Sequence, residues 1–186
     1  MAFLAALWLP ILASAAAVWF TSALFWMAVG HHNKDYGHLA DEAGFIAEMK
    51  KRNIAPGNYA FPNCADHSRM KDPAIQELMK SGPVGFITFL RTPMSMGGNM
   101  IKSVLVYLAI SVVVAYLGWF TLPHANLEFK HGFQVLGTAG VLGYAFAHLP
   151  HGIWFGQSTR TMLLCVIDGI VYGLLTGAVF CLLWPK

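Results

Sequence analysis

Charged residues are scarce in this chain. Of its 186 residues, 11% are Asp, Glu, Lys or Arg and 56% are hydrophobic. In a soluble domain about a quarter of the residues are charged, so this composition excludes an ordinary soluble protein. The net charge of +3 is small and the sequence has a single basic run, residues 50–52. We therefore expect no nucleic-acid partner.

Cysteines and catalytic motifs are scarce too. The three cysteines, Cys64, Cys165 and Cys181, form no even set and predict no disulfide scaffold. The sequence has no phosphate-binding loop ending in Lys-Ser or Lys-Thr, no Gly-x-Ser-x-Gly elbow and no His-Glu-x-x-His zinc motif. Because so little catalytic equipment is visible, we expect a structural or accessory role rather than an enzyme.

Long apolar runs are what the chain has instead. About 20 apolar residues are needed to cross the ~30 Å hydrocarbon core of a bilayer. We therefore predict an all-α integral membrane protein with four transmembrane helices, forming one membrane domain over residues 1–186. The predicted transmembrane helices cover residues 2–30, 103–122, 133–155 and 161–184.

The segment between the first two predicted helices is polar. Residues 31–98 contain eight of the twelve Lys and Arg residues and seven of the nine Asp and Glu residues. Apolar residues at helical spacing predict a helix over 41–53, and Asp72 followed by Pro73 predicts the start of another. We expect a partly helical polar cap in which residues 59–69 are irregular.

Basic residues predict the orientation of the chain. Near the predicted helix ends, Lys and Arg are more frequent on the side of the cap than on the side of the two termini. Cytoplasmic loops carry an excess of Lys and Arg, so we predict that residues 31–98 face the cytoplasm. The overall pattern resembles that of small bacterial inner-membrane proteins. This resemblance implies a location, and a lipid bilayer as partner, but no particular activity.

Glycine recurs at short intervals in the last two predicted helices. Such a helix face has no side chains, so another helix can approach it backbone to backbone. These two faces can meet within one chain or pair between chains as a glycine zipper. Our leading interpretation is a structural or accessory membrane protein, acting as a homo-oligomer or as a subunit of a larger membrane complex. The glycines concerned are Gly137, Gly140, Gly143, Gly169, Gly173 and Gly177.

Asp168 is the one charged residue of the predicted fourth helix. A carboxylate inside a membrane costs about 2.5 to 3.5 kcal/mol on insertion scales, so it should face protein, water or a partner charge. An antiparallel third helix places His148 and His151 at a similar depth, and His31 belongs to the same half of the bundle. The alternative function is therefore an intramembrane cation, proton or metal site formed by Asp168 with these histidines. We expect no cofactor, with a metal ion or a haem as the alternatives.

A second group of possible metal ligands lies in the cap. Cys64 and His67 could join the polar residues at the start of this segment, and a thiolate with imidazoles suits zinc or copper. Their spacing matches no zinc signature, however. A solvated loop with scattered polar residues is the simpler interpretation.

Overall fold

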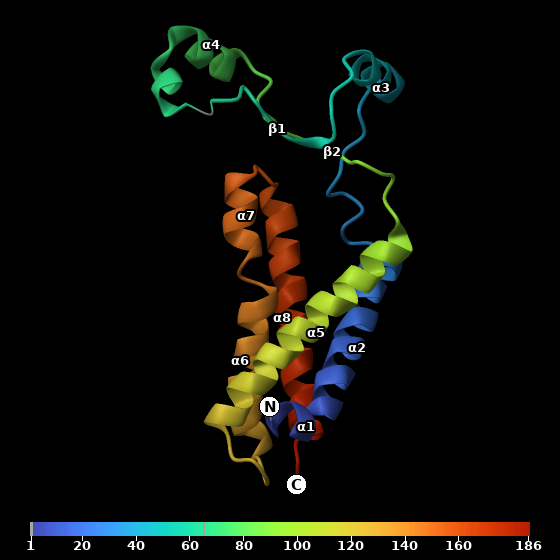
Figure 1. The fold of residues 1–186 in the computed structure, drawn as a ribbon, viewed down its shortest axis with the longest axis vertical. Coiled ribbons are helices and arrows are strands. Elements are labelled where there is room, and N and C mark those ends of the chain that lie inside the picture. Colours follow the sequence, from blue (N-terminus) through green and yellow to red (C-terminus); the bar gives the residue numbers. More distant parts are fainter. Residues whose placement is uncertain (1, 65) are drawn as a thin grey trace. The chain divides into compact units, whose positions relative to one another are not determined.

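The computed structural model describes residues 2–64 and 66–186, without the side chain of His67. The described chain is mostly helical and divides into two compact units (Figure 1). The first unit comprises the chain up to Asp35 together with Ser95–Ile153 and Gln157–Lys186. The second comprises Tyr36–Met94 and Trp154–Gly156.

Three helices of the first unit are long and apolar enough to span a membrane. The first consists of α2 (Trp8–Ala23) and its π-helical continuation η1 (Leu24–Val29), and the others are α5 (Met96–Thr121) and α8 (Thr159–Leu182). Large apolar side chains point outward from them, as expected for surfaces that contact lipid. The predicted all-α membrane class fits this architecture, and length and hydropathy support three spans among the described residues.

The region predicted as one helix over residues 133–155 contains two helices. These are α6 (Phe129–Tyr144) and α7 (His148–Trp154). α6 has 16 residues, or about 24 Å at 1.5 Å per residue, which is less than the ~30 Å hydrocarbon core. Pro150 explains the break. Proline is tolerated in the first turn of α7, but in a continuous helix its ring would clash with the carbonyl of Phe146.

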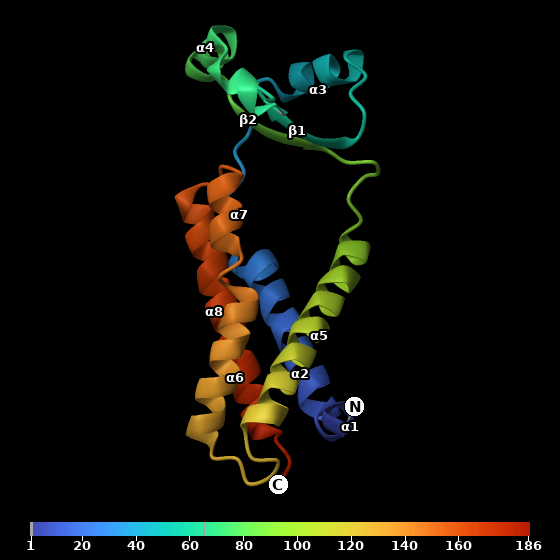
Figure 2. The same ribbon diagram turned by 60° about the vertical axis from the view of Figure 1, so that its left-hand side comes forward.

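α6 and α8 form the closest helix pair of the first unit, and Figure 2 shows them side by side. Glycines of the two helices face each other's backbone. A Cβ atom at Gly173 would lie 2.2 Å from the amide nitrogen of Val141, and one at Gly177 would lie 2.6 Å from Cα of Gly137. These distances are shorter than any real Cβ contact, so both positions require glycine for this approach.

The other predicted glycines differ in what they contact. A Cβ atom at Gly140 would lie 2.8 Å from Cα of Gly173, and one at Gly169 would lie 2.7 Å from the carbonyl oxygen of Tyr144. Gly143 faces α5 instead, where its Cβ would lie 3.0 Å from the side chain of Ile110. Close backbone approach is thus concentrated between α6 and α8.

An apolar cluster fills the end of the first unit where both termini lie. Leu7, Leu136 and Phe180 are fully buried in it. α1 (Ala2–Ala6) and the end of α8 are at this end (Figure 1). Leu7, just before α2, and Trp184, just after α8, belong to the same cluster, and α2 also packs against α8.

The second unit covers most of the predicted cap, but residues 31–35 and 95–98 belong to the first unit. Its helices are α3 (Glu42–Lys51), the short 3-10 helix η2 (His67–Lys71) and α4 (Pro73–Ser81). Carboxylates cap both α-helices, since Asp41 accepts a hydrogen bond from Gly44 N–H and Asp72 accepts one from Ala74 N–H. The cap is partly helical, as predicted.

A small antiparallel sheet in this unit was not predicted, because residues 59–69 were expected to be irregular. It consists of β1 (Gly57–Phe61) and β2 (Gly85–Phe89), with Tyr59 opposite Ile87. The two strands are short and are separated by η2 and α4 along the chain. No hairpin turn therefore connects them, and the sequence lacks the usual short-range signal for strand pairing.

Candidate functional site

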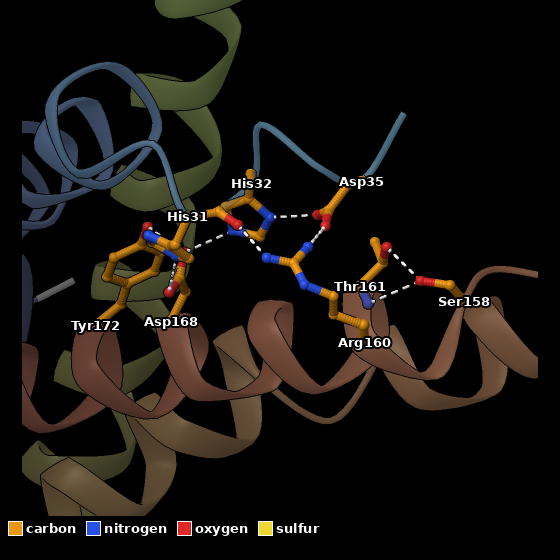
Figure 3. A network of polar contacts seen from close by, with 8 residues as sticks. All are labelled: His31, His32, Asp35, Ser158, Arg160, Thr161, Asp168 and Tyr172. Carbon is orange, nitrogen blue, oxygen red and sulfur yellow. Dashed lines mark hydrogen bonds and ion pairs between the residues drawn. The ribbon is translucent and has the colours of Figure 1, made fainter. Parts of the chain in front are cut away.

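His31 and His32 lie in a turn that ends the first membrane helix. Gly30 terminates η1 with a φ of +64°, in the left-handed region that favours glycine. A Cβ atom here would lie 2.7 Å from the side chain of Asn33. After Gly30, Asn33 N–H donates to its carbonyl at 3.0 Å and Asp35 N–H donates to the carbonyl of His32 at 2.9 Å. This turn brings both histidine side chains to α8 (Figure 3).

Asp168 on α8 is the carboxylate that both histidines meet. Asp168 is 4% exposed and therefore buried. Its Oδ1 lies 3.0 Å from Nε2 of His31, and its Oδ2 lies 3.1 Å from Nε2 of His32. The hydroxyl of Tyr172, one turn further along α8, donates to Oδ2 at 3.5 Å. Each oxygen of the Asp168 carboxylate thus contacts a histidine that directly follows the first membrane helix.

Asp35 holds the opposite edge of the His32 ring. Its Oδ2 lies 2.6 Å from Nδ1 of His32. Arg160, in the first turn of α8, donates to the other oxygen of Asp35 and also to the carbonyl of His31. The hydrogen bond with His32 is the main cause that lowers the pKa of Asp35 from its ordinary value. Burial opposes this shift, whereas the charge of Arg160 adds to it, so Asp35 is a fixed negative charge at neutral pH.

Two aromatic rings fix the orientation of the histidines. Trp26 stacks on His32 with ring centroids 3.9 Å apart and an interplanar angle of 6°. Phe25 meets the His31 ring edge-on at 5.4 Å. Both aromatic residues belong to η1, and π-helical turns of this kind occur frequently at functional sites. The end of the first membrane helix therefore positions His31 and His32 as well as supplying them.

One additional positive charge at the site would satisfy both carboxylate contacts of His32. A neutral imidazole has one N–H donor and one lone pair, so it can donate to Asp35 or to Asp168 but not to both. With both histidines neutral, the two carboxylates and the guanidinium of Arg160 sum to a charge of −1. A second proton on His32 would satisfy both carboxylates. A cation bound to Nε2 and to Asp168 would satisfy them equally.

The same atoms have the arrangement of metal ligands. His31, His32 and Asp168 each offer one ligand atom, and these three atoms lie within 4.8 Å of one another. Bonds of about 2.0 to 2.2 Å from a zinc ion to imidazole nitrogen and carboxylate oxygen would fit this set after small side-chain movements. The nitrogen of His32 that faces away from Asp168 is bound to a carboxylate, as is usual for histidines that bind metals.

None of the other predicted site residues with a described side chain belongs to the group formed by His31, His32 and Asp168. His148 lines the same cavity as Asp168, but neither it nor His151 belongs to the metal-ligand group found among the described residues. Cys64 lies in the second unit, whereas His31, His32 and Asp168 belong to the first. The side chain of His67 lies outside the described part of the structure.

Three contributors were not predicted as members of the site. His32 and Asp35 are among the polar residues at the start of the cap that were considered with Cys64 and His67, and neither they nor Arg160 was predicted to bind Asp168. The sequence contains a local signal for His32 and Asp35, because these two residues lie three positions apart in the segment just after Gly30. Arg160 shows no comparable signal, because its contact depends on the packing of the first helix against the last.

Comparison with known proteins gives no assignment. No protein-family model matches the chain, and no curated protein or solved structure matches it. The chemistry of His31, His32 and Asp168 is therefore the basis for a functional proposal.

Proposed function

We propose that this protein is an integral membrane protein that binds a divalent transition-metal ion through His31, His32 and Asp168. The observation that supports it most is the position of His32 between two carboxylates, at 2.6 Å and 3.1 Å. Two imidazoles and one carboxylate suit zinc or ferrous iron. Three protein ligands also leave at least one coordination position open, as in catalytic rather than purely structural metal sites.

Asp35 and Arg160 support this proposal from outside the ligand set. A carboxylate on the far nitrogen of a metal-binding histidine selects the tautomer, orients the ring and raises its basicity. Asp35 is placed to do this for His32, and Arg160 holds Asp35 in turn. A purely structural hydrogen bond between Asp168 and one histidine would need neither residue.

The distribution of polar groups favours binding over conduction. The network from Asp35 to Tyr172 lies at the end of the bundle that contains Gly30, and the Ser14–Ser111 hydrogen bond follows further in. Beyond it, the opposite end is filled by the apolar cluster around Leu136 and Phe180. An ion path through the membrane would have to cross this cluster.

A haem fits the site less well than a single ion. Both Nε2 atoms of the histidines face the carboxylate of Asp168 at 3.0 and 3.1 Å. A haem bound by two histidines needs its macrocycle between the two nitrogens, where this carboxylate lies. Metal binding therefore needs only small movements, whereas haem binding would require Asp168 to leave.

The site can be tested by elemental analysis of the purified full chain. We expect about one zinc or iron ion per chain, and loss of this ion in Asp168→Asn and His32→Ala, since each removes a ligand. His124→Ala is the matched control, because His124 is exposed and bonded to the carbonyl of Trp119 instead.

Two further measurements distinguish the metal site from a proton site. A folded wild-type protein that binds neither zinc nor ferrous iron in titrations would contradict the metal site. A pH-dependent proton flux in reconstituted vesicles, abolished by Asp168→Asn, would then assign the extra positive charge to a proton.

We further propose that α6 and α7 together form a fourth crossing, and that the protein lies in a bacterial inner membrane with residues 31–98 on the cytoplasmic side. Support for the crossing is the close packing of α6 along α8.

A role as an accessory subunit or homo-oligomer has less support. The glycines that favoured it, such as Gly140 and Gly173, meet each other within one chain.

A further inference from the structure

A cavity of about 600 Å³ adjoins the proposed metal site. It is bordered by the first membrane helix, α5, the α6–α7 region and α8, all within the first unit. His32 and Asp168 form part of its wall, so a molecule in the cavity could reach the metal. The volume lies within the range of about 300 to 1,000 Å³ that is usual for small-molecule sites.

The cavity combines an apolar wall with one lysine. Val106 and Ile110 of α5 and Gly143 of α6 supply apolar lining, and Lys102 is the one Lys or Arg among the described lining residues. Lys102 lies near the start of α5 and is exposed. No described carboxylate forms an ion pair with it. A cation without a protein partner beside an apolar wall is suited to an anionic head group attached to a hydrocarbon chain.

Tyr144 borders the cavity but does not call for a ligand group. The residue is 7% exposed and its hydroxyl is buried near Ser111 and Thr176. Neither of these two residues lines the cavity, so the case for an acidic ligand rests on Lys102 and the apolar lining.

The bound metal ion would determine the sign of charge that the cavity accepts. Without it, the carboxylate of Asp168 repels an anion. A divalent ion on Asp168 and two neutral histidines leaves a charge of +1, and Lys102 adds another. Both groups then attract an anionic head group, Lys102 from α5 and the metal ion from α8.

We propose that this cavity binds an acidic lipid, with its acidic head group between Lys102 and the metal ion at Asp168 and its hydrocarbon chain along α5 and α6. This inference rests on the proposed metal-binding function. The acid could be a free fatty acid or an anionic phospholipid, since both combine an acidic head with a hydrocarbon chain.

The test uses the full chain in phosphatidylcholine nanodiscs, loaded with zinc and titrated with lauric acid. Methyl laurate is the uncharged control, and dilauroyl phosphatidic acid distinguishes a two-chain phospholipid from a fatty acid. We expect lauric acid or phosphatidic acid to bind at least about tenfold more tightly than methyl laurate, and removal of zinc to weaken this binding by a similar factor.

Lys102→Gln should weaken binding of the acid about tenfold without changing the zinc content. Lys130→Gln is the matched control, because Lys130 lies in α6 and does not line the cavity. Equal affinity for lauric acid and methyl laurate, or unchanged binding in Lys102→Gln, would overturn the lipid site and leave the metal site intact.

Failure of the metal site gives a different result. A protein that binds no zinc would overturn the proposed function and the metal contact of the head group. Binding of the acid that still depends on Lys102 would, in that protein, support a lipid site at Lys102 alone.

Discussion

Asp35 contacts the proposed metal-ligand set at His32. It touches neither His31 nor Asp168 in the described hydrogen-bond network. Its carboxylate nevertheless fixes which nitrogen of His32 faces Asp168, and its charge makes that nitrogen a better donor to a cation. Residues that act in this indirect way typically change metal affinity without removing the site.

We predict that Asp35→Asn weakens zinc binding about 10- to 100-fold while leaving the protein folded. The amide oxygen can still accept the hydrogen bond from His32, whereas the amide nitrogen cannot accept the one from Arg160. The effect therefore reports the lost charge together with the lost contact to Arg160. Zinc affinity is measured by competition with a chelator of known affinity. Asp41→Asn serves as the control, because Asp41 caps α3 in the second unit.

An unchanged zinc affinity in Asp35→Asn would show that Asp35 does not contribute to the site. Loss of all binding together with loss of secondary structure would show instead that Asp35 is needed for folding. Circular dichroism of the same preparation separates the two.

At the scale of helices, α6 and α8 depend on the absence of side chains at particular positions. The environment differs along the interface. A Cβ atom at Gly173 would meet the backbone of Val141 at 2.2 Å, whereas a Cβ atom at Gly137 would meet only side chains, at 3.8 Å or more. These two glycines therefore allow a matched comparison within one helix pair.

We predict that Gly173→Ala lowers the free energy of unfolding by about 1 to 3 kcal/mol, because the added methyl group forces the helices apart. Gly137→Ala should leave it unchanged or raise it by up to about 1 kcal/mol, since alanine favours the helix and has room. Unfolding in mild detergent, followed by circular dichroism, measures both. Equal stability of the two variants would contradict close packing of α6 on α8.

Element boundaries were predictable where composition changes sharply. The last helix was expected over residues 161–184 and occupies Thr159–Leu182. α5 begins at Met96 rather than at residue 103, because the Ser95 side chain caps it by accepting a hydrogen bond from Gly98 N–H. Gly97 and Gly98 weaken the helical signal before residue 103, so the earlier start depends on the cap at Ser95.

At the scale of the molecule, the number of crossings is the decisive question. We predict four crossings, with residues 95 and 157 on one side of the membrane and residues 130 and 186 on the other. Single cysteines at these positions, in a variant without the three native cysteines, can be labelled with an impermeant maleimide in intact cells. Labelling of positions 130 and 157 from the same side would contradict a crossing by α6 and α7.

Part of the site was predictable from the sequence alone. A carboxylate deep in a membrane helix is costly, so Asp168 was expected to have a partner, and His31 was one of those proposed. His148 was proposed because helix order places it at a similar depth, yet depth does not determine which residues face each other. The direction of His32 depends on the turn at Gly30, and the contact of Arg160 depends on tertiary packing.

The distance along the chain between the parts of this site has a consequence for biosynthesis. His31 and Asp168 are 137 positions apart. At a typical synthesis rate of about 5 to 20 residues per second, the ribosome needs roughly 7 to 27 s to make the intervening chain. During this interval the two histidines are already present, but the carboxylate that completes the site does not exist. A metal ion held by all three ligands would therefore mark a chain whose last helix has been inserted and has found the first.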